Sequence, residues 1–492
     1  MDQAAAQPLK WYQGLEKYCW VVLVISALGW LFDTMDQNLF NLVRKVSIED
    51  LIYPHAEYVN LKHEERLKKL TTEERVGFEK DVKRVGGNVT SIFLIGWAAG
   101  GFLFGILGDR LGRTKTMIIT ILIYAIFTGG SGLIGWGFIP RSWELYGFMR
   151  FMTGLGVGGE WAAGAALVAE TFPQRSRPMA LGLLQALSSV GNMMAALITF
   201  GIEGAGLGWR IVYFVGAAPA LLVLWIRRSV HEPEQWVNAK EKASMGKEMG
   251  KIGELFTHPV LRRNLIASVL MGTAGVGALW GIGFFSTDFV LGELTAAGID
   301  PATRNQTKNI MFFLQNLGSF FGIYTFALFT EKFNRKKAFY LSFAVAWISI
   351  LVFFWALGGS GAKAKTLALI LAPILGFCTL MPFSGYTIYF PELFPTRLRT
   401  TGCGFAYNAA RILAAGAPPL LASLSASLAV YDAQGKLIKG GFAPAASIVV
   451  CIYILGFIGT WLGPETKGKP LPEDKDFETA PSIQAVPATQ QP

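Results

Sequence analysis

Long apolar runs are the feature that most restricts how this chain of 492 residues can fold. Twelve runs reach about 20 residues, the length that a helix needs to cross a hydrocarbon core of about 30 Å. They predict an all-α membrane protein with 12 transmembrane helices, and glycine breaks in several runs leave 10 or 14 as alternatives. The expected spans are 18–43, 89–108, 115–137, 143–170, 178–203, 209–228, 263–290, 308–330, 337–358, 366–391, 400–428 and 443–463.

Composition supports a membrane protein and argues against other classes. Only 16% of the residues are charged, whereas about a quarter of a soluble chain is charged. The net charge of +10 is typical of a membrane protein with basic cytoplasmic loops, so we expect no nucleic-acid partner. The four cysteines lack paired spacing and the four histidines lie outside the spans. We therefore expect no disulfide, no metal site and no cofactor.

The distribution of basic residues predicts the orientation. If both termini are cytoplasmic, the five inner connections carry 19 Lys and Arg residues, and the five short outer connections carry 8. The positive-inside rule therefore predicts a multi-pass protein of the cytoplasmic membrane with both termini inside. The segment 46–88 would then be external. Its charged stretch 64–84 indicates a solvated helix, for which a substrate-gating cap is the alternative.

Two motifs recur at a single offset of 222 residues. Residues 109–115 (DRLGRTK) align with 331–337 (EKFNRKK), and residues 169–177 (AETFPQRSR) align with 391–399 (PELFPTRLR). A duplicated six-span unit predicts two pseudo-symmetric six-helix bundles. Transporters that are built from two such repeats bind their substrate near the midplane, between the repeats. The expected parts are a cytoplasmic N-terminal tail 1–17, a first bundle 18–228, a cytoplasmic linker 229–262, a second bundle 263–463 and a cytoplasmic C-terminal tail 464–492. Residues 465–492 form a short, polar segment, so we expect them to be disordered.

The loop 108–113 (GDRLGR) resembles the signature loop of the major facilitator superfamily between its second and third spans. The resemblance covers almost the whole chain. Residues 464–468 (PETKG) are similar to a C-terminal motif of the sugar porters, whereas 158–161 (GGEW) and 402–418 resemble proton symporters of organic acids and sialic acid. The resemblance implies the major facilitator fold and a secondary active transporter that works by alternating access.

The same resemblance assigns residues to a gate on the cytoplasmic side. It implies that Asp109 lies at the N-terminus of the span 400–428, where the helix dipole favours an anion, and so holds the inner side closed. The residues assigned to gating are Gly108, Asp109, Arg110, Gly112, Arg113, Glu170, Arg177, Glu392 and Arg399.

Charged residues inside the spans are candidates for proton coupling. Asp33 and Asp36 are three residues apart and so share a helical face. Asp33 lies roughly 22 Å from the cytoplasmic side and Arg150 roughly 12 Å below the outer side, which are similar depths. A pair of Arg150 with either Asp could bind and release a proton or could be a static bridge. Glu160 could be a second proton carrier or the partner of an arginine nearer the cytoplasm.

Arg411 is the main candidate for substrate binding. It lies roughly 16 Å into its span, close to the midplane, where a guanidinium needs an anion. That anion could be a substrate carboxylate or a carboxylate of the protein. Other polar or amphipathic residues that could line the cavity, or could instead form helix-packing hydrogen bonds, are Asn408, Tyr386, Tyr389, Gln315, Asn316, Trp280, Gln185 and Asn192.

These features together favour proton-coupled symport of a small organic anion, such as a carboxylate or a sugar acid. A porter for a neutral sugar is the alternative, and a transporter-like sensor is the third interpretation. An enzyme is not expected, because the chain has no HExxH, GxSxG or P-loop pattern. The expected partners are a small-molecule substrate, protons and the lipid bilayer, and the chain is expected to be a monomer.

Overall fold

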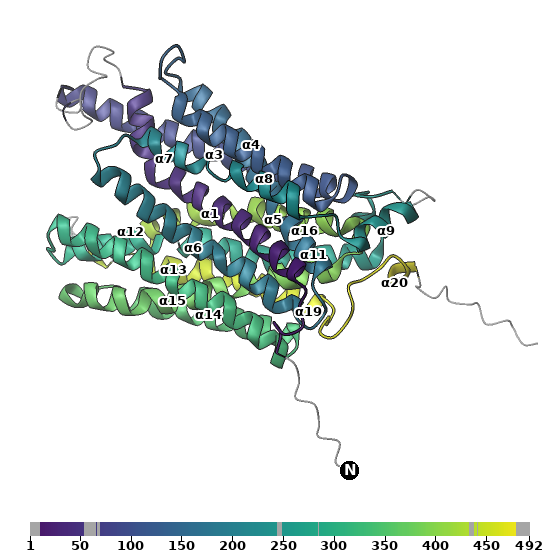
Figure 1. Ribbon diagram of the computed structural model, residues 1–492. Helices are drawn as coiled ribbons and strands as arrows, with labels where there is room; N and C mark the ends of the chain where they lie inside the picture. Colours follow the sequence, from purple (N-terminus) through teal and green to yellow (C-terminus); the bar gives the residue numbers. More distant parts are fainter. Residues whose placement is uncertain are drawn as a thin grey trace, which may run out of the picture.

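The computed structural model describes residues 10–53, 65, 69–243, 248–283, 285–431, 437–439 and 441–478. Nearly all of them are helical, and the helices run side by side in a single bundle (Figure 1). A short hairpin of β1 (Val430–Tyr431) and β2 (Leu437–Lys439) is the exception.

Within the described residues, the chain crosses the bundle twelve times. The first six passes are α1 (Lys17–Leu51), α3 (Thr72–Arg110), α4 (Arg113–Leu133), α5 (Trp143–Thr171), α6 (Arg177–Gly204) and the pair α7 (Trp209–Gly216) and α8 (Ala220–Ser229). Two short helices, α9 (Glu234–Ala243) and α10 (Glu254–Thr257), lie between the halves of the sequence.

The last six passes are more broken than the first six. They comprise α11 (Pro259–Ala278), the π-helix η2 (Leu279–Gly283) and α12 (Phe285–Ala296); α13 (Pro301–Lys332); α14 (Arg335–Leu357); η3 (Gly361–Lys363), α15 (Ala364–Tyr389) and η4 (Phe390–Leu393); η5 (Thr396–Leu398), α16 (Arg399–Ala414) and α17 (Ala417–Ser427); and α18 (Phe442–Val449), η6 (Val450–Ile452) and α19 (Tyr453–Leu462). A final short helix, α20 (Lys475–Glu478), follows.

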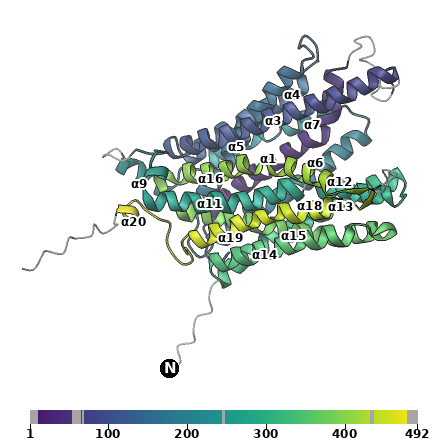
Figure 2. The same cartoon turned by 180° about the vertical axis from the view of Figure 1, so that it is seen from behind.

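This arrangement confirms the predicted fold class. Ten of the passes in the described part of the chain are long and apolar enough to cross a membrane, and α5 and the α11–α12 pair complete the twelve. Seen from behind, α3, α4 and α5 lie on one side of the molecule and α14, α15 and α19 on the other, with α1, α11 and α16 between them (Figure 2). Helices α9 and α20 lie at one end of the bundle, which we call the linker end (Figure 1).

The predicted boundaries around the segment 46–88 are wrong. Helix α1 continues to Leu51, and α3 already begins at Thr72. A capping box starts α3, because Glu74 N donates to the Thr71 side chain and the Glu74 carboxylate accepts from Thr71 N at 2.9 Å. The charged residues from 72 to 84 are thus the first turns of a transmembrane helix rather than a separate helix. Hydropathy detects only the apolar part of such a helix.

Glycines bring the helices around the centre into close contact. A methyl group on Gly100 of α3 would lie 2.0 Å from the Leu155 carbonyl oxygen of α5, and one on Gly101 would lie 1.7 Å from the Asn408 amide of α16. Only residues without a side chain permit this approach. Helix α3 therefore packs against α5 on one side and against α16 on the other, which joins the two halves.

Candidate functional site

A network of charged residues joins the two halves at the linker end. Asp109, at the end of α3, accepts hydrogen bonds from the backbone N–H groups of Thr400 at 3.1 Å and Thr401 at 2.9 Å. The Thr401 hydroxyl donates a third bond at 2.6 Å. Asp109 therefore caps the N-terminus of α16, where the helix dipole favours a negative charge.

Glu170 adds an ion pair across the same junction. Its carboxylate accepts from Arg113 at 2.8 and 3.0 Å within the first half and from Arg399 at 2.5 Å in the second half. Arg113 also donates to the Thr396 carbonyl oxygen of the second half at 2.7 Å. Arg113 and Arg399 are fully buried, so each needs these partners in place of water.

The second half repeats part of this network at the predicted offset. Arg335 pairs with Glu392 at 2.8 and 3.2 Å, as Arg113 pairs with Glu170. Glu232 accepts from the N–H of Arg113 at 2.7 Å, and Glu465 accepts from that of Arg335 at 3.0 Å. Burial alone raises the pKa of Glu465, but the N–H groups of Lys467, Lys336 and Arg335 outweigh it and lower that pKa overall.

The remaining residues assigned to the gate shape the same region. A methyl group on Gly108 would lie 2.9 Å from the Thr400 hydroxyl. Gly112 has a φ of +113°, a conformation that L-residues rarely adopt, and it abuts Glu232. Arg110 donates to the Met249 carbonyl oxygen at 3.2 Å, and Arg177 donates to that of Ala169 at 2.8 Å.

Inside the bundle, Arg150 pairs with Asp36 rather than with Asp33. The Nη1 atom of Arg150 lies 4.0 Å from the nearer Asp36 carboxylate oxygen, and both side chains are fully buried. Arg150 also donates to the Ser131 hydroxyl at 2.6 and 3.2 Å and lies 4.7 Å from the ring centre of Tyr213. The aspartate and arginine are therefore in loose contact, and neither Asp36 oxygen has a hydrogen-bond partner in the described part of the chain.

Arg411 lies between two aromatic rings at the junction of the halves. Its guanidinium carbon is 4.0 Å from the ring centre of Trp97 in α3 and 4.2 Å from that of Tyr407 in its own helix. Tyr407 in turn stacks on Trp161 of α5 at 4.4 Å. The Nη1 atom donates to the Asn408 side chain at 3.0 Å. No carboxylate among the described residues forms an ion pair with Arg411.

Comparison with known proteins identifies the family. Residues 83–419 match the family model of the Major Facilitator Superfamily. The chain belongs to the Major Facilitator Superfamily. The relatives of this chain are named as transporters of small molecules. The protein is therefore a multi-pass membrane transporter and not an enzyme.

The relatives differ in the substrates that their names give. A probable 4-methylmuconolactone transporter of Cupriavidus pinatubonensis is 28% identical over 78% of this chain and 82% of its own. The sialic acid transporter NanX of Escherichia coli is 29% identical over 68% of this chain and 77% of its own. Among solved structures, the proton:xylose symporter XylE aligns with a TM-score of 0.66 at 18% identity over 92% of this chain and 98% of its own, which supports the shared fold.

Amide side chains also link the two halves of the transporter, where α6 meets α13 and α15. Asn192 of α6 donates to Asn316 of α13 at 2.9 Å and accepts from Asn38 of α1 at 2.6 Å. Gln185 accepts from Trp161 at 3.1 Å and from Thr387 of α15 at 2.8 Å. Gln185, Asn192 and Asn316 thus lie where α6 meets the second half. Asn408 lies at a different contact between the halves, against Gly101 of α3 and beside Arg411.

Other predicted lining residues lie elsewhere. The Tyr386 hydroxyl donates to the Met271 carbonyl oxygen at 2.7 Å, and the Tyr389 hydroxyl donates to that of Pro464 at 2.5 Å. Both tyrosines therefore serve packing within the second half. Trp280 lies in the π-helix η2, and Gln315 lies on α13 one residue before Asn316. The sequence alone does not show whether a tyrosine in an apolar span faces the junction between the halves or the interior of one half.

Three aromatic residues around Arg411, namely Trp97, Trp161 and Tyr407, are not among the substrate-binding residues that the sequence predicts. Aromatic residues in spans usually belong to the packed core, so their type alone carries little information. The available signal was the helical spacing of four between Tyr407 and Arg411, which places the ring beside the guanidinium.

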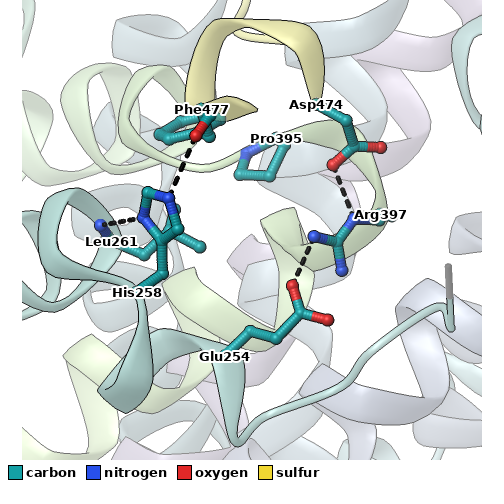
Figure 3. A pocket seen from close by; sticks show the side chains of 7 residues that line it. All are labelled: Glu254, His258, Leu261, Pro395, Arg397, Asp474 and Phe477. Atoms are coloured by element: carbon teal, nitrogen blue, oxygen red, sulfur yellow. Dashed lines mark hydrogen bonds and ion pairs between the residues drawn. The ribbon is translucent and has the colours of Figure 1, made fainter. Parts of the chain in front are cut away.

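The C-terminal segment packs against the linker end, which corrects the expectation of a disordered tail for residues 465–478. A cavity of about 330 Å³ lies beneath it, and Figure 3 shows the side chains that line this cavity. Arg397 bridges Glu254 of α10 and Asp474 of the C-terminal segment, the latter at 2.5 Å. His258 lies 3.0 Å from the Phe477 carbonyl oxygen. The cavity is lined by Glu254, His258, Leu261, Pro395, Arg397, Asp474 and Phe477.

Loss of the charge on Asp109 is expected to open the linker end. Asp109→Asn removes the charge that faces the dipole of α16 and pairs with Arg113 at 2.9 Å, and it leaves only one acceptor oxygen. Such a charge at a helix N-terminus is worth about 1 kcal/mol, so the open population should rise about fivefold. Cys403 is a natural reporter, because it is fully buried beside this network. Its labelling by a membrane-impermeant thiol reagent should accelerate in a chain whose other cysteines are replaced. Glu331→Gln, at the exposed equivalent position, is the control, and equal rates in both variants would contradict the gating role.

A smaller effect is expected at the C-terminal segment. Asp474→Ala removes one of the two carboxylates on Arg397, a partly exposed pair worth up to about 1 kcal/mol. Labelling of Cys403 should therefore rise by at most about fivefold. Lys475→Ala, which breaks only the exposed pair with Glu473, should leave labelling unchanged. An unaltered rate in Asp474→Ala would mean that the C-terminal segment does not stabilise the closed linker end.

Proposed function

We propose that this transporter is a proton-coupled symporter of a small organic anion, a carboxylate or a sugar acid, across the cytoplasmic membrane. The observation that carries the proposal is Arg411, a cation about halfway along its pass. Aromatic rings cover both faces of its guanidinium, and in the described part of the chain no carboxylate forms an ion pair with it. A guanidinium at such depth is unfavourable unless it meets an anion. Its planar edge suits a carboxylate, which it can hold through two parallel hydrogen bonds.

Asp36 and Arg150 are the proposed proton-coupling pair. Their 4.0 Å separation is longer than a charged hydrogen bond, so the contact can be made or broken by a small helix shift. A carboxylate that loses its arginine in a buried site binds a proton, and one that regains it releases the proton. Alternating access would make and break this contact in each cycle.

The linker end is proposed to face the cytoplasm, as the positive-inside rule indicates. The conformation described above is then closed toward the cytoplasm by Asp109 and Glu170. Transport would require both cross-half contacts, Asp109 with α16 and Glu170 with Arg399, to break so that the halves can rock apart.

A porter for a neutral sugar is the second candidate. The chain of amides formed by Asn38, Asn192 and Asn316 offers donors and acceptors that suit sugar hydroxyl groups. An uncharged sugar would leave Arg411 without an anion, however. The names of the two relatives described above, a muconolactone transporter and a sialic acid transporter, also support an acidic substrate.

Uptake into proteoliposomes tests the proposal. The panel contains sialic acid, 4-methylmuconolactone, simple mono- and dicarboxylates and D-xylose, each with and without an alkaline interior. We expect at least one acid to accumulate only with the pH gradient, and a protonophore should abolish accumulation. Gradient-driven uptake of xylose without uptake of any acid would favour the sugar porter.

A further inference from the structure

Glu160 lies against the backbone of α1, one turn from Asp33. A methyl group on Gly29 would lie 1.9 Å from the Glu160 Oε1 atom, so the carboxyl group occupies the space that the glycine leaves. Gly29 and Asp33 are four residues apart and share a helical face. The carboxyl groups of Asp33 and Glu160 therefore face each other, from α1 and α5, and are at most 1% exposed.

The four oxygen atoms of these two carboxyl groups lack donors. Among the described residues, none donates a hydrogen bond to any of them. Two ionised carboxylates in contact, and away from water, repel each other and lose their hydration. One shared proton replaces that repulsion with a short O–H···O⁻ hydrogen bond, which is among the strongest in proteins.

The charged and titratable groups around the pair come from four helices. Asp36 lies one turn further along α1, and Arg150 of α5 is already paired with it. Tyr124 of α4 is buried, and its hydroxyl has no partner among the described residues. Arg411 of α16 is the cation near the pair, because Trp161, the residue after Glu160, stacks on Tyr407 at 4.4 Å, and the Arg411 guanidinium carbon lies 4.2 Å from the centre of that ring. The pair is thus separate from Asp36 and Arg150 but electrostatically linked to Arg411.

We propose that Asp33 and Glu160 share one proton at neutral pH and form a second proton site, linked to the anion site at Arg411. The site itself follows from the buried contact, whereas its part in transport rests on the proposed function. An anion on Arg411 neutralises the cation that favours ionised Asp33, so anion and proton bind the transporter cooperatively. Asp36 then supplies the proton that crosses the membrane with the anion, and the proton shared by Asp33 and Glu160 sets how the affinity for the anion depends on pH.

Infrared spectroscopy tests the proton site without any substrate. The full chain in lipid nanodiscs is titrated with acid and base, and the C=O band of buried protonated carboxyl groups is followed. We expect this band at pH 7 in the wild type and in Asp36→Asn, and we expect its loss in the double variant Asp33→Asn/Glu160→Gln. A wild type without the band, or a double variant that keeps it in full, would overturn the proposal.

Two glycine variants test the contact while keeping both carboxyl groups. Gly29→Ala should push Glu160 away from Asp33 and move the midpoint of the titration by about one pH unit, or tenfold in proton affinity. Gly164→Ala is the matched control on α5, because its methyl group would meet only Ser26 at an ordinary 3.8 Å. Equal midpoints in Gly29→Ala and the wild type would reject the shared proton.

Arg411→Gln tests the link to the anion site. Loss of the cation should strengthen proton binding, so the midpoint should move to higher pH. An unchanged midpoint would reject the link. This outcome is distinct from a failure of the proposed function, because a transporter that takes up no acid from the panel could still show the infrared band and its shift.

Discussion

Asp36→Asn is expected to abolish accumulation of substrate while leaving exchange intact. In the wild type, one coupled proton supports about tenfold accumulation for each pH unit of gradient, because one unit corresponds to about 1.4 kcal/mol. An asparagine cannot take up and release the proton, so the substrate should only equilibrate across the membrane. Counterflow of pre-loaded substrate needs no net proton movement and should continue.

The measurement is uptake into proteoliposomes of the acid that the panel identifies, with and without a pH gradient. Asp300→Asn is the matched control, because Asp300 caps α13 on the surface and asparagine is an equally good helix cap. Loss of both accumulation and counterflow in a variant that folds normally would indicate a structural role for Asp36. Retained accumulation would remove it from the coupling mechanism.

The fold could be predicted from the sequence because its determinants are local. Each run of apolar residues predicts one membrane helix, and the two motifs repeated at an offset of 222 residues indicate the duplication. The equivalence of Arg113 with Arg335, and of Glu170 with Glu392, then appears in the structure as two ion pairs of the same geometry. The helix extensions beyond the apolar runs were missed, since they are polar and project past the hydrocarbon.

The pairing of buried charges could not be predicted because it depends on how each helix is rotated. Asp33 and Asp36 share a helical face, so their spacing alone does not decide which of them pairs with Arg150. Rotation and packing bring Asp36 to Arg150 and turn Asp33 toward Glu160. Gly29 makes room for Glu160, but this role follows only from the packing of α1 against α5 and not from the sequence.

Arg411→Lys is expected to weaken binding of the transported acid by about 10- to 100-fold without unfolding the protein. Lysine keeps the positive charge but loses the planar pair of donors that matches a carboxylate. Charge-assisted hydrogen bonds are worth roughly 1.5 to 3 kcal/mol, which corresponds to that loss of affinity. Lysine also stacks less well between Trp97 and Tyr407, so the remaining charge would be held less rigidly.

Thermal-shift titrations with the acid and with its neutral amide measure this effect. The acid should stabilise the wild type more than the amide does, and Arg411→Lys should lose most of this difference. Arg210→Lys is the matched control: Arg210 also stacks on a tryptophan, at 4.3 Å, but pairs with Asp50 at 3.0 Å in the first half. Its variant should keep the affinity for the acid. If the wild type binds acid and amide equally well, Arg411 does not recognise a carboxylate, and the neutral-sugar porter becomes the better account of this transporter.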